Sequence, residues 1–189
     1  MRKMIMVLGL VTLISGVVLA GIYSGLIPRI EANQQAALER SLSALFEDAE
    51  EPEFEELDTG GPTIYRAETS GGDLLGYAVR VSATGYGGEI RLLVGISPDL
   101  SSIAGLQIVE QVETPGLGAR ITEEDFRDQF EDLDPGETIS YVKNEEPDYE
   151  ENEIQAISGA TISSEAVVDG VNADVDRAVE ILREEEGQS

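Results

Sequence analysis

The feature that most constrains the fold of this chain is an uncharged apolar run near its amino terminus. It extends from Met4 to Pro28, is rich in Val, Leu, Ile and Gly, and contains no Asp, Glu, Lys or Arg. As a helix rising about 1.5 Å per residue, such a run is long enough to cross the hydrocarbon core of a bilayer. We therefore predict that it forms a single transmembrane helix.

The residues that flank this run indicate its orientation. Arg2 and Lys3 precede it, and basic residues favour the cytoplasmic side, so we expect a cytoplasmic amino terminus and an extracytoplasmic remainder in the plasma (inner) membrane. A cleaved signal peptide is the alternative, with Val18-Leu19-Ala20 as a small-residue cleavage site. The apolar run continues past that site to Ile27, which favours the uncleaved anchor.

The composition excludes several kinds of chemistry. The chain has no Cys and no His, which rules out a Cys-ligated iron–sulfur cluster, a His-ligated haem, the usual zinc sites and a Ser-His-Asp triad. We predict no metal site and no catalytic residue. If this chain does redox work, an organic cofactor must supply the chemistry.

The charge of the chain restricts its partners. Three of the 12 Lys and Arg residues and none of the 38 Asp and Glu residues lie within residues 1–29, so residues 30–189 carry 9 basic groups against 38 acidic ones. Nucleic acids and anionic membrane surfaces are therefore poor partners for this part of the chain.

The pattern along the chain predicts three parts. Residues 1–29 form the cytoplasmic end and the anchor, and residues 30–58 form a juxtamembrane helix, ending near Glu50, and an acidic linker. Residues 59–189 form an extracytoplasmic domain. The helix is expected because apolar residues recur at helical spacing at Leu38, Leu42, Leu45 and Phe46.

The outer domain is predicted to be α+β, an antiparallel sheet packed against helices with a final helix after a small-residue loop. Four segments with β-branched residues and partial alternation predict strands at Thr63–Ala67, Leu74–Ala83, Glu89–Ile96 and Ile103–Val112. Further along, we expect a short helix over Ile121–Phe130 capped by Thr122, a strand over Thr138–Lys143, an acidic turn over Asn144–Glu153, and the last helix from about Ser164 to Glu185.

One candidate site lies where a loop meets this last helix. Ser158-Gly159-Ala160-Thr161 is nearly free of bulky side chains, and the unpaired N–H groups of a helix amino terminus attract phosphate. Gly159 and Ala160 would let a ligand approach the backbone closely. The alternative is a simple turn in which Ser163 or Ser164 caps the helix.

Two further loops contain glycine. In Glu113-Thr114-Pro115-Gly116-Leu117-Gly118 a turn explains most residues, but an exposed Leu117 between two glycines would suit contact with a flat ring. Gly85-Tyr86-Gly87-Gly88 is more typical of a hairpin turn than of a ligand contact. The acidic cluster Asp148–Glu153 is interpreted as a solvated surface rather than a calcium site.

Taken together, these segments carry a family resemblance. The stretches ETPGLGARI, TGYGGEIRLLVGI and SGATISSEAVVDGVN resemble the G subunit of the Rnf electron-transport complex and its relative, the C subunit of the sodium-pumping NADH:quinone oxidoreductase. The resemblance covers the anchor and nearly all of the outer domain.

The resemblance implies a function and a set of site residues. In that family the last Thr of the Ser-Gly-Ala-Thr motif carries FMN through a phosphoester bond made by a separate flavin transferase, and by position that residue is Thr161. Ser158, Gly159 and Ala160 would shape the phosphate site, and Thr114, Gly116 and Leu117 would line the isoalloxazine. The family often has Asp where this chain has Gln155.

The implied protein is an electron-transfer subunit of a membrane-bound, ion-translocating ferredoxin:NAD oxidoreductase. It would act with the other membrane subunits of the complex and is not expected to be catalytic alone. Two alternatives stay open: a stand-alone anchored FMN-binding domain that serves another respiratory reductase, and a non-redox structural exterior domain.

Overall fold

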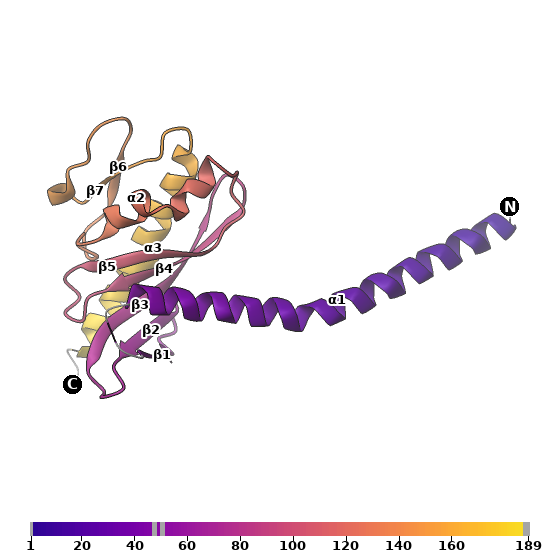
Figure 1. Cartoon of the computed structure of the whole chain (residues 1–189), viewed down its shortest axis with the longest axis horizontal. Helices are drawn as coiled ribbons and strands as arrows, with labels where there is room; N and C mark the ends of the chain where they lie inside the picture. Colours follow the sequence, from indigo (N-terminus) through magenta and orange to yellow (C-terminus); the bar gives the residue numbers. More distant parts are fainter. Residues whose placement is uncertain (1, 47–48, 50–51, 187–189) are drawn as a thin grey trace. The chain divides into compact units, whose positions relative to one another are not determined.

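The computed structural model describes residues 2–46, 49 and 52–186 (Figure 1). The chain divides into two compact units, Met1–Glu39 and Arg40–Ser189. Helix α1, Arg2–Leu45, begins in the first unit and ends in the second. Its apolar part is exposed and is long enough to cross a membrane. The predicted juxtamembrane helix is thus a continuation of the anchor, and its predicted end at Glu50 falls outside the described residues.

The second unit is built on an antiparallel sheet whose five strands follow the order of the chain. The strands are β1 (Glu53–Leu57), β2 (Ile64–Glu68), β3 (Leu74–Thr84), β4 (Glu89–Ile96) and β5 (Ile103–Glu110). The predicted meander is confirmed. Each connection is short, and Gly85 N–H donates to the Gly88 carbonyl at 2.8 Å to close the β3–β4 hairpin, as the glycine-rich sequence predicts.

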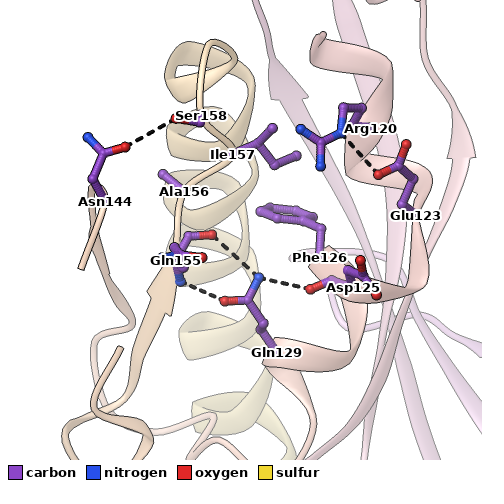
Figure 2. A pocket seen from close by; sticks show the side chains of 10 residues that line it. All are labelled: Arg120, Glu123, Asp125, Phe126, Gln129, Asn144, Gln155, Ala156, Ile157 and Ser158. Atoms are coloured by element: carbon purple, nitrogen blue, oxygen red, sulfur yellow. Dashed lines mark hydrogen bonds and ion pairs between the residues drawn. The ribbon is translucent and has the colours of Figure 1, made fainter. Parts of the chain in front are cut away.

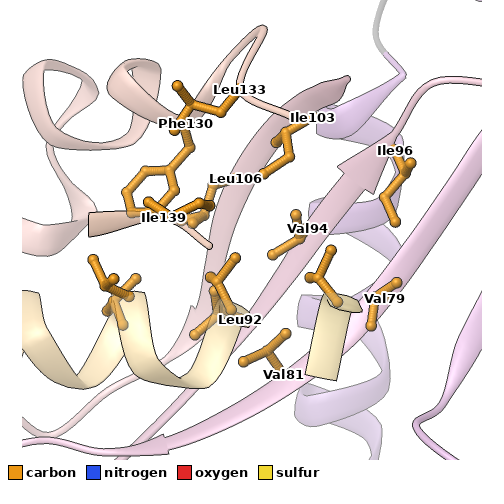
Figure 3. Packing of buried hydrophobic residues seen from close by; sticks show 14 of the residues in the cluster. Val79, Val81, Leu92, Val94, Ile96, Ile103, Leu106, Phe130, Leu133 and Ile139 are labelled. Atoms are coloured by element: carbon orange, nitrogen blue, oxygen red, sulfur yellow. The ribbon is translucent and has the colours of Figure 1, made fainter. Parts of the chain in front are cut away.

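One face of this sheet is covered by the last helix, α3, Thr161–Glu186. Alternate residues of the central strands point to the same side of a sheet, so Val79 and Val81 of β3 join Leu92 and Val94 of β4 in one buried layer (Figure 3). The apolar stripe of α3 packs on this layer. Its buried members are Val167, Val168, Val171, Val175, Ala178, Val179 and Leu182.

Close approach between α3 and the sheet depends on a small residue. A Cβ placed at Gly170 would lie 3.0 Å from side-chain atoms of Val81 and Ala83. This is tighter than ordinary van der Waals contact, so a side chain there would push the helix away from β3. Gly170 therefore helps to set how closely α3, and with it the candidate site at its amino terminus, lies on the sheet.

The opposite face of the sheet receives the end of α1. Gly95 of β4 pairs with Gly105 of β5, and Leu45 lies beside both of these glycines. Phe46 is buried and its ring centroid lies 6.0 Å from that of Phe54 on β1. The sheet is thus covered on both faces at this point.

Several boundaries differ from the sequence-based expectations. Glu53–Leu57 was expected in the linker but forms a strand that pairs with β2. The sequence did not indicate this strand because acidic residues on the exposed face of an edge strand hide its alternation. The predicted strand to Val112 ends at Glu110. Thr138–Lys143 is reduced to β6 (Ser140–Val142), which pairs in parallel with β7 (Glu153–Gln155), a strand that the acidic turn pattern did not predict.

The predicted helix over Ile121–Phe130 is broken into three short pieces. They are η1 (Gly118–Thr122), α2 (Glu124–Arg127) and η2 (Asp128–Phe130). Thr122 does not cap α2: Glu123 occupies the cap position without a side-chain hydrogen bond, and the Thr122 hydroxyl donates to the Ala119 carbonyl instead. Phe126 and Phe130 are buried edge to face at 5.6 Å between centroids, so tertiary packing rather than capping holds this segment.

Candidate functional site

The small-residue loop leads directly into α3, which begins at Thr161, three residues before the predicted start. Gly159 has a φ of 82°, a left-handed conformation that side chains rarely adopt. Ala160 N–H donates to the Ile157 carbonyl at 2.9 Å, which closes the turn just before the helix. Thr161 is therefore the first helical residue, with its side chain only partly buried.

Two serines that the sequence suggested as caps lie inside the first turn of α3. Ser163 and Ser164 are 2% and 0% exposed. The Ser164 hydroxyl accepts a hydrogen bond from Ile157 N–H at 3.0 Å and donates to the Ala160 carbonyl at 3.2 Å. Neither serine is the amino-terminal cap, but Ser164 satisfies a buried N–H group of the preceding loop, which is what a cap does for a helix.

A buried carboxylate joins three separate segments of the chain beside this turn. Glu113 is 5% exposed. One of its oxygens accepts from Gly87 N–H at 2.7 Å and the other accepts from the Ser163 hydroxyl at 2.8 Å. A Cβ at Gly118 would collide with the Glu113 carboxylate and would lie 2.6 Å from Ser163 Oγ. The glycines of the hairpin and the loop are therefore required for this carboxylate to fit.

The glycine loop after Glu113 also reaches the small-residue motif. Leu117 N–H and Ala119 N–H both donate to the Thr114 carbonyl, which folds the loop back on itself. A Cβ at Gly159 would lie 3.6 Å from Leu117 Cδ2, whereas a Cβ at Gly116 would meet open space. The structure thus brings Leu117 next to the motif, while Thr114 and Gly116 shape the loop that carries it.

Exposed apolar side chains gather on the loops that meet here. They are unusual on a domain whose surface is mostly acidic. Each belongs to the β3–β4 turn, to the chain around Glu113 or to the first turn of α3. These residues, which we call the apolar rim, are Tyr86 (75% exposed), Val112 (63%), Leu117 (48%) and Ile162 (55%). An exposed apolar group of this kind indicates a surface that contacts a ring or a partner.

A cavity of about 320 Å³ borders the other side of the motif (Figure 2). Ser158 lies at its edge, where the Ser158 hydroxyl donates to Asn144 Oδ1 at 3.1 Å. Gln155 also lines the cavity; its N–H donates to Gln129 Oε1 at 2.7 Å, and its side-chain amide donates to the Glu145 carbonyl at 2.7 Å. Gln155, where the family often has Asp, thus makes hydrogen bonds to neutral groups through both its backbone and its side chain.

One basic side chain among the described residues lines the cavity, and a second lies one residue before Asn144 in the chain; both are engaged. Arg120 lines the cavity and pairs with Glu123 at 3.0 Å, and Lys143 Nζ lies 5.4 Å from the centroid of the Tyr141 ring. A hydrogen bond to Glu165, one helical turn after Thr161, raises the pKa of the Tyr141 hydroxyl, with smaller contributions from desolvation and the charges of Glu165 and Asp169. The phenol therefore stays neutral and acts as a donor at physiological pH.

The part of the chain that the structure describes holds no group of acidic residues placed to bind a metal ion. Sequence reasoning named Glu113 only as the start of a glycine loop and Ser163 only as a possible cap; it missed the contact between them and the role of Asn144. A single acid before Thr114 and a serine in a helical pattern give no local signal, because the partners of Glu113 lie 26 and 50 residues away along the chain.

These features fit a domain that holds a phosphorylated, flat cofactor, and comparison with known families agrees. A family model described as an FMN-binding domain matches residues 85–176, from the β3–β4 turn into α3. Solved structures share the fold. They include the C subunit of the Na⁺-translocating NADH-quinone reductase from Parabacteroides distasonis (TM-score 0.57, 24% identity, 64% of this chain and 62% of that one) and NqrC of Shewanella oneidensis (TM-score 0.53, 18% identity, 68% and 69%).

Curated relatives narrow the family further. The G subunit of a proton-translocating ferredoxin:NAD⁺ oxidoreductase complex from Clostridium ljungdahlii is 34% identical over 87% of this chain and 84% of its own length. The G subunit of an ion-translocating oxidoreductase complex from Methanosarcina acetivorans is 46% identical over 63% and 61%, and a Na⁺-translocating counterpart from Acetobacterium woodii is 43% identical over 56% and 50%. The chain belongs to the family of G subunits of ion-translocating oxidoreductase complexes.

Proposed function

We propose that this chain is the electron-transfer flavoprotein subunit of a membrane-bound, ion-translocating ferredoxin:NAD oxidoreductase complex, and that FMN is attached to Thr161 through a phosphoester bond. The observation that carries the proposal is the position of Thr161. It is the first residue of a 26-residue helix, it follows a left-handed glycine by two positions, and it stands on the partly exposed side of the turn.

The surroundings of Thr161 suit the attachment of a phosphate. The first N–H groups of a helix have no partner within the helix, and its positive end favours an anion. The exposed Ser158 hydroxyl donates to Asn144 Oδ1, and Gly159 and Ala160 add almost no bulk that would block a modifying enzyme. Thr161 would supply the ester oxygen and give up its hydroxyl proton, and a flavin dinucleotide would be a suitable donor because its pyrophosphate bond could break to release a nucleoside monophosphate as the leaving group.

The apolar rim supplies a surface for the flat part of such a cofactor. Leu117 lies against Gly159 and Ile162 follows Thr161 directly, so both are within reach of a ring tethered to Thr161. Bound FMN would supply one- and two-electron transfer without a metal. The chain's own residues would hold the phosphate at the helix terminus and keep the ring at high local concentration through the tether.

The residues that flank the anchor support a side of the membrane for the domain. Arg2 and Lys3 before the apolar run favour a cytoplasmic amino terminus, so the acidic domain would lie outside the cytoplasm. α1 would then hold the flavin beside membrane-embedded subunits of the same complex. A flavin transferase acting on the exterior side is the partner required for maturation.

Intact mass of the full chain purified from its own membranes tests this proposal. We expect a mass that includes residues 1–28 and one FMN, and co-purification with several multi-spanning membrane proteins. A mature amino terminus at Gly21 would contradict the anchor, and a mass without flavin would contradict the redox function. Flavin without the multi-spanning partners would favour a stand-alone anchored flavoprotein.

A further inference from the structure

The strongest feature that the proposed function does not use is the buried carboxylate of Glu113. Among the described residues, the buried polar or charged side chains are those of Glu113, Asn152, Ser163 and Ser164, and of these four Glu113 alone is a carboxylate. Burying a charge is costly unless it is well hydrogen-bonded, so a carboxylate retained at this position indicates a specific role.

Glu113 links the three segments that surround Thr161. Its carboxylate binds Gly87 of the β3–β4 turn and Ser163 of α3, and its own chain continues into the loop that carries Leu117. Each of these three segments contributes to the apolar rim: Tyr86 from the turn, Leu117 from the loop and Ile162 from the helix. One side chain therefore fixes the relative positions of these segments.

The negative charge of Glu113 is compensated by dipoles. The described ion pairs are formed by Arg66, Arg91 and Arg120, and none of them involves Glu113. The Gly87 N–H, the Ser163 hydroxyl and the positive amino-terminal end of α3 stabilise the carboxylate instead of a basic side chain. A buried charge is screened by solvent far less than an exposed one, so its field extends into the neighbouring site.

We propose that Glu113 is a positioning residue of the flavin site that also lowers the reduction potential of the attached flavin through its buried negative charge. This inference rests on the proposed function. A negative charge beside the ring opposes the arrival of an electron, and the Ser163 hydroxyl partly offsets that charge by directing its proton toward the carboxylate. The two side chains therefore act on the potential in opposite directions.

Glu113→Gln and Ser163→Ala, in the full-length, flavin-loaded protein in detergent, test this inference. Glutamine keeps the shape of the side chain, and its amide can donate to Ser163 Oγ while its oxygen accepts from Gly87 N–H. It therefore removes the charge and keeps the links. We expect the flavin midpoint potential of Glu113→Gln to move to more positive values, with flavin loading close to that of the wild type.

The opposite shift is expected for Ser163→Ala. This variant keeps the carboxylate and removes one of its donors, so the midpoint potential should move to more negative values. A role for both residues that was only structural would loosen the same site and move both potentials the same way. The matched control is Glu180→Gln, which removes an exposed charge about 25 Å along α3 from Ser163 and should leave the potential unchanged.

Three results would overturn the inference. They are a wild-type potential in loaded Glu113→Gln, shifts of the same sign in Glu113→Gln and Ser163→Ala, or a shift of equal size in Glu180→Gln. If Glu113→Gln does not fold, Ser163→Ala alone tests the inference. An unchanged or more positive midpoint potential in Ser163→Ala would then contradict the proposed effect of the Glu113 charge. Failure of the proposed function is distinct, because the wild-type protein would then carry no flavin.

Discussion

The first turn of α3 presents two faces that carry the same kind of side chain under opposite conditions. Ser163 and Ser164 face inward and are almost fully buried, whereas Thr161 is partly exposed and Ile162 is 55% exposed. The inward hydroxyls are engaged by Glu113, Ile157 and the Ala160 carbonyl. The partly exposed side chain of Thr161 stands at the helix terminus, where a phosphate would be favoured.

The difference separates buried hydroxyls that support the fold from one that a modifying enzyme could reach. A hydroxyl that is buried and hydrogen-bonded cannot be reached by a modifying enzyme, and it stabilises the backbone by satisfying groups that water does not reach. A hydroxyl on the outer face contributes little to stability and is able to become an ester oxygen. Substitutions on the inward face should therefore lower the free energy of unfolding, whereas substitutions on the outward face should change it little.

The largest expected effect comes from crowding the inward face. In Gly118→Ala, the new methyl group would collide with the Glu113 carboxylate and lie 2.6 Å from Ser163 Oγ. Glu113 cannot move away without losing its hydrogen bonds, so we expect a loss of about 2 kcal/mol in the free energy of unfolding. Chemical denaturation measures it. Gly71→Ala, in an exposed turn where a Cβ meets only ordinary contacts, is the control and should change stability by less than about 0.5 kcal/mol.

A smaller loss is expected for Ser164→Ala. The substitution leaves Ile157 N–H without its buried acceptor, which should cost about 1.5 kcal/mol of unfolding free energy, again measured by chemical denaturation. The matched control is Ser158→Ala, whose hydroxyl is exposed and bonds to Asn144 at the surface. Equal losses in the two variants would contradict the distinction between an inward and an outward face.

The smallest effect is expected at Tyr141, on the outward side. Its hydroxyl donates to Glu165, and this bond raises the pKa of the phenol above its ordinary value near 10. A raised pKa means that the bond stabilises the fold fully below about pH 10 and that this contribution disappears as the pH rises through the shifted pKa. Tyr141→Phe should therefore lower Tm slightly at neutral pH. Thermal melts at several pH values check this. If Tyr141→Phe lowers Tm as much above the shifted pKa as at neutral pH, the Tyr141–Glu165 hydrogen bond is not the cause.

The sequence predicted the sheet and α3 well because their patterns are local. Alternation in β3 and β4, and the stripe Val167, Val171 and Val175, follow directly from a half-buried strand and a packed helix. The start of α3 was placed three residues late, because the first helical residues lack the apolar spacing of the later turns. β1 and β7 were missed because edge strands with acidic residues resemble linkers and turns.

The candidate site also combines residues that local motifs indicate with residues that only the fold brings together. Thr161, its small neighbours and Leu117 could be named from contiguous motifs, and the structure brings Leu117 beside Gly159. Glu113 and Ser163 could not be paired from sequence, since the contact spans 50 residues and neither residue stands out locally. Contiguous motifs could therefore propose Thr161 and its neighbours, whereas the pairing of Glu113 with Ser163 required the fold.

The most direct test of the outward face asks which hydroxyl of the turn carries flavin. Thr161→Ala, Ser163→Ala and Ser164→Ala should each be co-expressed in full length with a flavin transferase, denatured, and examined for flavin fluorescence on a gel. We predict that Thr161→Ala is dark and folded, and that both serine variants fluoresce. Fluorescence that persists in Thr161→Ala, with loss in Ser163→Ala or Ser164→Ala, would contradict the assignment of the outward face as the attachment site.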